Sequence, residues 1–437
     1  MNELFLRRMK ELLKDEYDAY ISLLDEKPLK GLRVNTLKTD VQTCMKDTGI
    51  SMTESPFAVN GYYIREERGL GLTPGYACGL FYLQEPSASA AVTVLAPEKG
   101  MKVLDLCAAP GSKSTQIAEL MQNEGLLVCN EINTSRARIL AENIERNGAA
   151  NCIIFNNDTD EIAAAFEGYF DAVLCDAPCS GEGMIRKEEN AAVMWSLQNV
   201  ELCARRQRMI IENAYRCLAG GGVLVYSTCT LNKEENEYLI ASFLKDHPDM
   251  HMEDAPVSFG RHGFAEGFET EKAVRIFPMD GGEGHFIARM RKDPGVNAQQ
   301  LPVMESRLPA NVRDVQDSIL EKPYPYYFIK ANRVYGGTYP FIMPKKLHLI
   351  RHQVFLGEIV RDRFEPSHHL FSSAYTAFKN CYDMNDEECL RYLHGEQLSV
   401  SLMKGWYAMQ WKGHTAGGAK CDGRALKNKY PKQYRLK

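Results

Sequence analysis

Histidine is missing from the first 246 residues of this 437-residue chain, and all ten histidines lie at His247 or later. A Ser-His or Cys-His catalytic pair within that segment is therefore excluded, unless a later segment reaches into the same site. The chain also lacks a Cys-x-x-Cys pair, so neither a zinc ribbon nor a thioredoxin-type site is expected, and no metal site is predicted. No stretch approaches the roughly 18 consecutive apolar residues of a membrane helix.

The thirteen cysteines follow no disulfide spacing, and many of them lie within apolar runs. Reduced thiols in a cytoplasmic protein are the expectation. The first twenty residues are charged throughout, which favours an amphipathic helix over a signal peptide. A length of 437 residues predicts two or three domains, and we expect a monomer without membrane contact.

Positive charge is concentrated at the end of a chain whose net charge is −5. Residues 412–437 contain eight Lys or Arg and one acid, Asp422. This segment is either a solvated basic tail or a surface that contacts phosphates. Aromatic residues among the cations favour an ordered surface. The candidate contacts are Lys420, Arg424, Lys427 and Lys429.

The middle of the chain alternates short apolar runs with helical patterns. The expected strands are 101–107, 126–131, 151–158, 170–178 and 222–229, and a further pair is expected at 273–278 and 284–290. Alternating strands and helices predict an α/β fold with a parallel sheet covered on both faces. Ligands of such folds bind beyond the carboxyl ends of the strands.

The turn after the first of these strands, residues 107–112, decides which cofactor is expected. It lacks both the dinucleotide fingerprint and the phosphate-binding loop. Its small residues let a ligand approach the start of the next helix, for which Ser112 is the expected cap. Glu131 is placed to accept from ribose hydroxyls and Asp158 from an adenine amino group. This combination suits S-adenosylmethionine, although each acid is also explained as a helix cap or a solvated rim residue.

Reactive side chains follow two neighbouring strands. Asp176 and Cys179 end the fourth strand, and Cys229 follows the fifth. Adjacent parallel strands lie about 4.8 Å apart, so the three side chains can share a pocket. A single cysteine at a strand end usually packs in the core. Two cysteines flanked by Pro, Ser, Gly and Thr favour chemistry instead: a thiolate that adds to carbon 6 of a pyrimidine activates carbon 5, with help from an acid at N3.

Five segments together resemble the NSUN/Sun (Fmu) family of RNA cytosine carbon-5 methyltransferases. They are LRVNTLK (32–38), GLFYLQEPSAS (79–89), DLCAAPGSKSTQIA (105–118), DAPCSGEG (176–183) and YSTCTLNKEENE (226–237). Two later segments, RDRFEPSHHLF (361–371) and ALKNKYPKQYR (425–435), resemble the bacterial RsmF-like branch, which methylates small-subunit ribosomal RNA.

The resemblance implies a role for each residue at the strand ends. Cys229 matches the nucleophile, Cys179 the cysteine that assists release of the RNA, and Asp176 the acid that engages cytosine. The reverse assignment of the cysteines stays open, because DNA enzymes of related chemistry use the Pro-Cys cysteine as nucleophile. Lys113 is the candidate cation that lowers the pKa of Cys229. The implied cofactor contacts are Cys107, Ala108, Ala109, Pro110, Gly111, Ser112, Lys113, Glu131, Asp158 and Asp176; Ser112 stands where the family usually has glycine.

The resemblance also implies a domain organisation. A class I S-adenosylmethionine-dependent methyltransferase core of Rossmann-like fold (71–293) is expected between a small α+β, ferredoxin-like RNA-binding domain (1–70) and a C-terminal α+β region. The latter, 303–437, is expected to fold separately after a linker at 294–302, with a PUA-like lobe from about residue 365. Arg33 and Asn35 are candidate RNA contacts, and the alternative for Arg33 is a plain surface charge.

The function expected from this organisation is methylation of cytosine carbon 5 in RNA. The partner is expected to be 16S ribosomal RNA or the small ribosomal subunit. A transfer RNA substrate is a second hypothesis. The third is an RNA-binding assembly factor that keeps the fold without turnover, although such a protein has no need for Cys179, Cys229 and Asp176.

Overall fold

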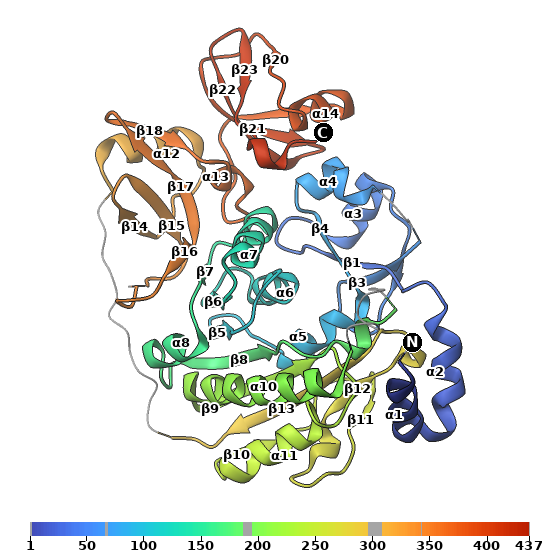
Figure 1. The fold of residues 1–437 in the computed structure, drawn as a ribbon. Coiled ribbons are helices and arrows are strands. Elements are labelled where there is room, and N and C mark those ends of the chain that lie inside the picture. Colours follow the sequence, from blue (N-terminus) through green and yellow to red (C-terminus); the bar gives the residue numbers. More distant parts are fainter. Residues whose placement is uncertain (1, 66–68, 187–194, 296–307, 342, 437) are drawn as a thin grey trace.

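The computed structural model describes residues 2–65, 69–186, 195–295, 308–341 and 343–436. Figure 1 shows a large central sheet with helices on both faces, a blue N-terminal unit to its right, and orange and red C-terminal units above it. The predicted α/β class is confirmed, since strands and helices alternate along the middle of the chain.

A parallel sheet forms the centre of the fold. Its parallel strands are β5 (Lys102–Asp105), β6 (Leu126–Asn130), β7 (Cys152–Phe155), β8 (Phe170–Asp176) and β9 (Leu218–Thr228). Each corresponds to one of the predicted strands. They lie in the order β7-β6-β5-β8-β9, so the direction in which the chain moves across the sheet reverses between β5 and β8. Open α/β sheets bind their ligands at such a reversal, beyond the carboxyl ends of the strands.

Antiparallel strands extend the sheet beyond β9. They are β13 (His285–Lys292), which pairs with β9, then β12 (Val274–Ile276) and β11 (Arg261–His262), with β10 (Met250–Met252) pairing on β13. The predicted pairing of 273–278 with 284–290 is confirmed, because β12 and β13 are antiparallel neighbours.

Two layers of helices cover this sheet. One face packs against α5 (Ala90–Leu95), α6 (Ser112–Met121) and α7 (Thr134–Asn147), and the other against α8 (Thr159–Ala165), α10 (Leu197–Cys217) and α11 (Glu237–Asp246). The pattern of α7 shows why it packs as it does. Its buried residues include Ala137, Leu140, Ala141 and Ile144, whose spacing of three and four places them on the face toward the sheet.

The prediction that Ser112 caps α6 is wrong. Gly111 occupies the N-cap position with a φ of 112°, and no side chain caps this helix start. A side chain at Gly111 would force a backbone conformation that L residues rarely adopt, and its Cβ would lie 3.1 Å from Leu140 Cδ1. Glycine is therefore required where the chain turns from β5 into α6.

The N-terminal unit is a four-stranded antiparallel sheet with two helices. Its elements are β1 (Gly31–Val34), α3 (Val41–Thr48), β2 (Met52–Glu54), β3 (Gly61–Ile64), α4 (Pro74–Ala77) and β4 (Phe81–Gln84). The strand order β2-β3-β1-β4 is that of a βαββαβ, ferredoxin-like unit. Because β4 pairs with β1, this unit extends past the predicted boundary at residue 70.

The amphipathic N-terminal helix is present as α1 (Glu3–Leu13), followed by α2 (Tyr17–Leu24). Phe5, Met9 and Leu13 are buried along one side of α1. The Phe5 ring packs edge-on against Trp195, with 5.5 Å between the ring centroids. The apolar face of α1 is thus covered by the segment that leads into α10.

The expectation that residues 303–437 fold separately is wrong, because parts of this region pack against the rest of the chain. A sheet of β14 (Tyr326–Lys330), β15 (Arg333–Gly337), β17 (Val354–Val360) and β18 (Arg363–Pro366) packs against α12 (Ala310–Ile319). The strand β16 (Leu349–His352), however, leaves this lobe and pairs antiparallel with β7 of the central sheet. Without β16, β7 would present unpaired backbone groups at a sheet edge.

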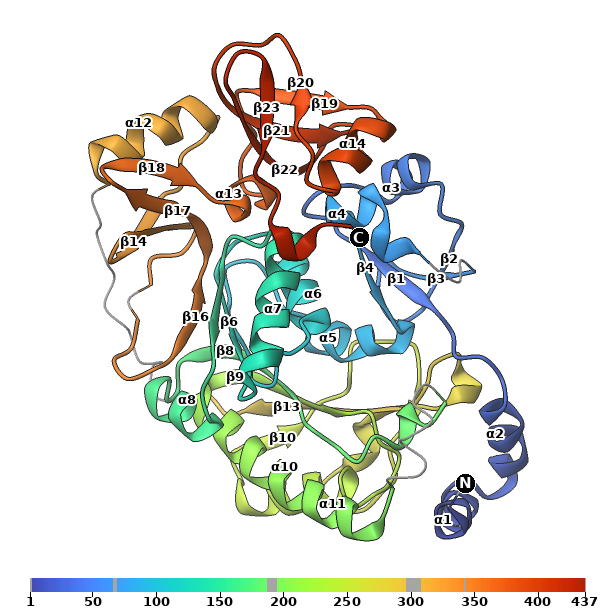
Figure 2. The same ribbon diagram turned by 45° about the horizontal axis from the view of Figure 1, so that its top comes forward.

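The last unit is a five-stranded sheet with two helices. Its elements are α13 (His368–Ser372), β19 (Cys381–Met384), α14 (Asp386–Leu393), β20 (Leu398–Ser399), β21 (Gly405–Trp411), β22 (His414–Cys421) and β23 (Ala425–Asn428). Figures 1 and 2 both place α14 beside α4. Cys78 and Phe81 of the N-terminal unit share one hydrophobic cluster with Tyr392 and Met409, so the two units pack as one body.

The predicted linker and the predicted absence of a membrane helix are the remaining expectations about the fold. Most of the linker predicted at 294–302 lies outside the described residues, which stop at 295 and resume at 308. Within the described part of the chain, no helix combines the length and the apolar composition that crossing a membrane requires.

Candidate active site and nucleic-acid surface

A cavity of about 690 Å³ lies at the reversal point of the sheet. It is lined by residues that follow the carboxyl ends of the five parallel strands, and α10 forms one of its walls. The predicted site residues that line it are Cys107, Ala109, Glu131, Asp158, Asp176, Cys179 and Cys229. The cavity therefore lies at the edge of the sheet where the rule for open α/β sheets predicts a ligand to bind.

The two cysteines singled out in the sequence face each other in this cavity. Cys179 lies in the loop after β8, Cys229 is the first residue after β9, and their Sγ atoms are 3.1 Å apart. Parallel pairing of Asp176 with Ser227 explains their meeting, since each cysteine lies two or three residues beyond that pair. Both thiols are free.

The two thiols differ in acidity although they are neighbours. The hydrogen bond between the two thiols lowers the pKa of Cys229 against the effects of burial and of the negative charge of Asp176, and the positive charge of Lys113 lowers it further. The same hydrogen bond, followed by burial, raises the pKa of Cys179 well above its usual value. Cys229 is therefore the thiol that more readily becomes a thiolate, the reactive form.

Asp176 is held from two sides. Lys113 Nζ lies 2.7 Å from Asp176 Oδ2, and Ser227 Oγ donates to Asp176 Oδ1 at 2.7 Å. Burial alone would lower the pKa of Lys113, but the Asp176 carboxylate outweighs it and raises that pKa. Lys113, the predicted cation near Cys229, thus keeps its charge and reaches the site through this ion pair.

Both predicted cofactor acids line the cavity. Glu131 is 3% exposed and accepts a hydrogen bond from the Asn133 backbone N–H at 2.9 Å. Asp158 caps α8 and accepts from the Asp160 N–H at 3.0 Å, so the helix-cap explanation also holds for it. A carboxylate offers about four lone-pair positions, so both acids retain capacity for ligand hydroxyl or amino groups.

The turn between β5 and α6 forms less of the cavity wall than predicted. Cys107 and Ala109 line the cavity. The other small residues of the turn are not among the lining residues: Ala108, Pro110, Gly111 and Ser112. The carbonyl of Ser112 instead accepts a hydrogen bond from Arg33 at 3.1 Å, so this end of the turn faces the N-terminal unit.

Asp105, the last residue of β5, is a buried polar group directly before the cavity-lining residues Leu106 and Cys107, and it was not among the predicted site residues. It is fully buried, and its Oδ2 accepts from Ser114 Oγ at 2.6 Å. Its Oδ1 has no hydrogen-bond partner among the described residues. Burial raises the pKa of Asp105 to about 7. A buried acceptor without a protein partner at this position suits a polar ligand group.

Helix α10 supplies a wall of the cavity that sequence reasoning missed. The residues concerned are Arg206, Met209, Ile210 and Asn213. Their spacing of three and four places them on one face of the helix. That spacing is visible in the sequence, but no local pattern indicates which face of α10 turns toward the strand ends.

The structure corrects the prediction that Arg33 and Asn35 contact RNA, since each is 1% exposed. Arg33 Nε lies 2.8 Å from Glu119 Oε2 on α6. Asn35 Nδ2 donates to the backbone carbonyls of Gly79 and Asn147, both at 2.8 Å. Every residue of β1 is buried, and so is Asn35, which follows it, so the polar groups of Arg33 and Asn35 require partners inside the protein. Arg33 and Asn35 therefore join the N-terminal unit to the core.

Replacing Arg33 by alanine should destabilise the fold by about 3–5 kcal/mol, because Glu119 would stay buried without its partner. Urea unfolding followed by circular dichroism measures the loss. Arg7, exposed on α1, provides the control, and Arg7→Ala should change stability by less than about 0.5 kcal/mol. An Arg33→Ala protein of unchanged stability but weakened RNA binding would restore the original assignment.

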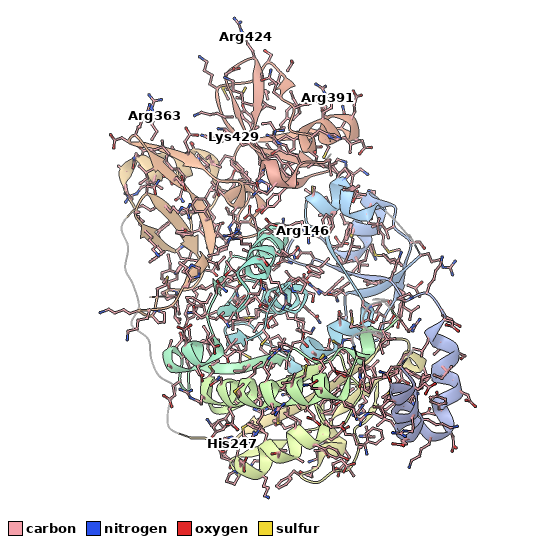
Figure 3. All side chains as sticks on the ribbon, in the orientation of Figure 1. Arg146, His247, Arg363, Arg391, Arg424 and Lys429 are labelled. Carbon is pink, nitrogen blue, oxygen red and sulfur yellow. The ribbon has the colours of Figure 1, made fainter. Side chains whose placement is uncertain are left out.

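The last unit carries the predicted cationic surface. Its four candidate contacts are all exposed: Lys420, Arg424, Lys427 and Lys429. Figure 3 shows Arg424 at the far end of this unit and Lys429 nearer its base. Cross-strand pairing sets Lys420 opposite Lys427, so these two side chains leave the sheet on the same face. Cations gathered on one face favour a phosphate backbone as partner.

An acid and an aromatic ring organise part of this surface. The ammonium groups of Lys420 and Lys429 lie 5.1 and 5.5 Å from the centroid of the Trp406 ring. Glu365, on β18, lies 3.5 and 3.9 Å from the same two groups. The cations are thus held on an ordered surface, as the aromatic residues in this segment predicted.

Models of known families match three parts of the chain. Residues 92–291 match the 16S rRNA methyltransferase RsmB/F family, residues 1–86 the N-terminal domain of 16S rRNA methyltransferase RsmF, and residues 379–436 the methyltransferase RsmF PUA domain. The predicted methyltransferase core, N-terminal domain and PUA-like lobe are confirmed by these matches. Residues 292–378, which include β14 to β18, lie outside all three.

Individual relatives agree with the family models. A ribosomal RNA small subunit methyltransferase F from Vibrio vulnificus is 37% identical over 334 residues, which cover 73% of this chain and 70% of that protein. The protein of the same description from Escherichia coli O157:H7 is 37% identical over 310 residues, 68% of this chain. The chain spans 64% of the length of this Escherichia coli relative, less than two thirds.

A solved structure matches the fold. The crystal structure of a methyltransferase homolog from Pyrococcus horikoshii is 31% identical to this chain and superimposes with a TM-score of 0.60. The match covers 67% of this chain and 95% of that protein.

Proposed function

Because the chain belongs to the RsmF family of 16S ribosomal RNA methyltransferases, we propose that it methylates carbon 5 of a cytosine in 16S ribosomal RNA. The observation that carries this proposal is the pair of thiols of Cys179 and Cys229, 3.1 Å apart and beside Asp176 in one cavity. Carbon 5 of a pyrimidine becomes nucleophilic only after a thiolate adds at carbon 6. Methylation of an amino group, whose nitrogen is itself the nucleophile, requires no such pair.

Cys229 is the nucleophile of this reaction. The target cytosine leaves its stack to enter the cavity, and Cys229 Sγ forms a bond to carbon 6. The electron pair of the broken ring double bond makes carbon 5 nucleophilic. Asp176, held by Lys113 and Ser227, passes a proton to N3 of the base, and the Lys113 ammonium, 2.7 Å from Asp176 Oδ2, supplies that proton. The proton neutralises the negative charge that addition moves onto the ring.

Cys179 assists the release of the RNA. After carbon 5 carries the methyl group, the carbon-5 proton leaves to solvent and the bond between carbon 6 and Cys229 Sγ breaks. Cys229 departs as a thiolate, and the Cys179 thiol, 3.1 Å away, donates a hydrogen bond to it. Such a bond stabilises the leaving group, since hydrogen bonds to charged groups are the stronger ones.

S-adenosylmethionine is the cofactor that fits the polar groups of the cavity. Glu131 and Asp158 offer carboxylate acceptors for ribose hydroxyls and an adenine amino group. When bound, this cofactor supplies an electrophilic methyl group. The chain's own contribution is to orient the base and to provide the two thiols.

Calorimetry with the full chain should detect binding of S-adenosylmethionine, and Asp158→Asn should weaken it about 5- to 20-fold through loss of a charge-assisted hydrogen bond. Asparagine is also a good helix cap, so α8 should persist. Asp40, which caps α3 by accepting from Thr43 N–H, provides the matched control. Asp40→Asn should leave the affinity unchanged. A folded wild-type protein that does not bind the cofactor would exclude the methyltransferase function.

The cationic surface of the last unit is proposed to contact RNA phosphates. Neutralising Lys420, Arg424, Lys427 and Lys429 together should weaken RNA binding and flatten its salt dependence, by about 0.7–0.9 in logarithmic slope for each phosphate interaction removed. Filter binding of a 16S ribosomal RNA fragment at several salt concentrations measures this. The matched control neutralises exposed cations elsewhere, namely Arg7, Lys10, Lys14 and Lys245. An unchanged salt dependence in the variant of the last unit would show that this surface does not contact RNA phosphates.

Two alternative functions, a transfer RNA methyltransferase and a non-catalytic assembly factor, make different predictions about which RNA carries 5-methylcytosine. Bisulfite sequencing of ribosomal and transfer RNA from a deletion strain distinguishes them. Loss of 5-methylcytosine from 16S ribosomal RNA supports the proposal, and loss from transfer RNA would support a transfer RNA methyltransferase. A strain that keeps all its 5-methylcytosine but assembles small subunits poorly would support a non-catalytic assembly factor.

A further inference from the structure

Two glutamates of the signature segments have no part in the chemistry described so far. Glu182 lies in the segment of Cys179, and Glu235 lies in the segment of Cys229. Both side chains are buried, since the two residues are 1% and 0% exposed. Glutamate is almost never fully buried unless it is paired, so the partners of these two carboxylates show what they do.

Glu235 reaches across to the segment that holds Cys179. Its Oε2 accepts from the Ser180 backbone N–H at 3.0 Å and from Gln207 Nε2 at 2.7 Å, and its Oε1 accepts from Ser180 Oγ. Gln207 also donates to the Pro178 carbonyl at 3.0 Å. Cys179 is thus fixed through the residues on both of its sides.

Glu182 makes the reciprocal connection, from the segment of Cys179 to the segment of Cys229. Its donors, at 2.7–3.0 Å, are the Thr230 hydroxyl, the backbone N–H groups of Leu231 and Asn232, and the Trp195 indole N–H. We refer to Glu182 and Glu235 as the glutamate clasp. It holds the two cysteine segments against each other at the distance that the chemistry uses.

Charged side chains act on the pKa of both thiols. The negative charge of Glu235 raises the pKa of Cys179, in addition to the larger effects of the Cys229 hydrogen bond and of burial. At Cys229 the hydrogen bond with Cys179 is the largest effect and lowers the pKa of the thiol; burial and the negative charge of Asp176 raise it, and the positive charge of Lys113 lowers it. Each thiol thus has a carboxylate near it, and Cys229 also has the cation Lys113.

Glu235 is surrounded by hydrogen-bond donors. Burial raises its pKa, and hydrogen bonds from Ser180, Asn232 and Gln207 offset part of that rise. Asn232 Nδ2 donates to Glu235 Oε1 at 2.7 Å, so every contact described for this carboxylate brings it a donor. A carboxylate that only accepts hydrogen bonds is stabilised in its charged form.

We propose that Glu235 selects the nucleophile of the cysteine pair: fixed beside Cys179 by Ser180 and Gln207, its carboxylate keeps the single shared proton on Cys179 and leaves the negative charge on Cys229. The sulfur atoms are 3.1 Å apart, so once the pair has lost one proton the remaining thiol can donate to the thiolate. Glu235 acts through Cys179 and is a positioning residue. The catalytic consequence of this inference rests on the proposed function. The position of the proton does not, because it is a property of the protein without RNA or cofactor.

Alkylation with iodoacetamide, in the absence of RNA and cofactor, measures which sulfur is the thiolate. Peptide mass spectrometry gives the initial rates at Cys179 and Cys229, and the exposed Cys381 serves as internal reference. In the wild-type protein Cys229 should react faster. Glu235→Gln should reduce the ratio of the two rates severalfold, because the lost charge acts more strongly on Cys179 than on Cys229 and only the difference between these two interactions changes the ratio. Glu235→Asp, which keeps the charge, should restore most of the ratio.

Glu182→Gln is the matched control, because it makes the same substitution in the other half of the clasp. It loosens the connection between the segments but leaves the charge beside Cys179 in place, so it should not lower the ratio. An equal decrease in both variants would show that geometry, not charge, sets the preference, and would overturn the inference. So would a Glu235→Gln protein with the wild-type ratio.

The outcomes for Glu235 and for the proposed function are separable. If the alkylation ratios follow the prediction but the wild-type protein forms no 5-methylcytosine, the proposed function fails and the inference stands. If the wild-type protein methylates RNA and Glu235→Gln leaves the alkylation ratio unchanged, the inference fails and the proposed function stands.

Discussion

Replacement of Cys179 by alanine should leave the protein covalently attached to its RNA. The Cys229 thiolate can still add to carbon 6, and one methyl transfer can occur. The thiol that lies 3.1 Å from the departing sulfur is then missing, so elimination stalls. Turnover should fall by about 10²–10⁴-fold, the usual contribution of a positioned acid–base group. Denaturing electrophoresis should show labelled RNA migrating with the protein.

Replacement of Cys229 should abolish both the adduct and the product. Under the proposed roles only Cys229 adds to carbon 6, and loss of a nucleophile costs roughly 10⁴-fold or more in rate. Cys175, buried in β8 just before the site, provides the control: Cys175→Ala should turn over at close to the wild-type rate without trapping RNA. A trapped adduct in Cys229→Ala would instead assign the nucleophile to Cys179. Two active variants without adducts would exclude covalent catalysis.

The meeting of the two cysteines could be predicted because it depends on strand order alone. Asp176 and Ser227 pair in adjacent parallel strands, and a parallel register carries whatever follows each strand to the same edge of the sheet. The apolar runs of these strands are short and continuous, which is the pattern of strands buried on both faces. Local sequence therefore contained the information that this part of the site needs.

The fate of Arg33 could not be predicted in the same way. The residue lies in a strand whose neighbours Leu32 and Val34 are apolar, yet burial of its guanidinium depends on Glu119, which is 86 residues away. The pairing of β16 with β7 has the same character, since His352 lies opposite Ile153. Contacts between distant segments follow from the packing of whole units, and no local period reports them.

The glutamate clasp could be predicted only in part from the sequence. Glu182 and Glu235 occur in conspicuous segments, and each lies close in sequence to a predicted cysteine. Composition would class both as exposed acids, because buried glutamates are rare. Only the arrangement of backbone N–H groups around them shows that they connect two loops.

The second large effect should come from Asp176. Lys113 and Ser227 hold its carboxylate in the cavity, where it engages the N3 edge of cytosine. Asp176→Asn keeps the size of the side chain but removes the charge that pairs with Lys113. Addition of Cys229 to carbon 6 should slow by about 10²–10⁴-fold, because asparagine cannot pass to N3 the proton that neutralises the charge developing on the ring.

The Cys179→Ala background makes this step visible, since the adduct accumulates there. Its rate of formation, measured with RNA in the absence of S-adenosylmethionine, reports on Asp176 without any contribution from cofactor binding. Ser227→Ala provides the control, because it removes the hydrogen bond at 2.7 Å but keeps the carboxylate and its ion pair. That variant should slow addition by about tenfold or less. If Asp176→Asn forms the adduct at the parent rate but methylates slowly once the cofactor is supplied, Asp176 serves the cofactor and not the base.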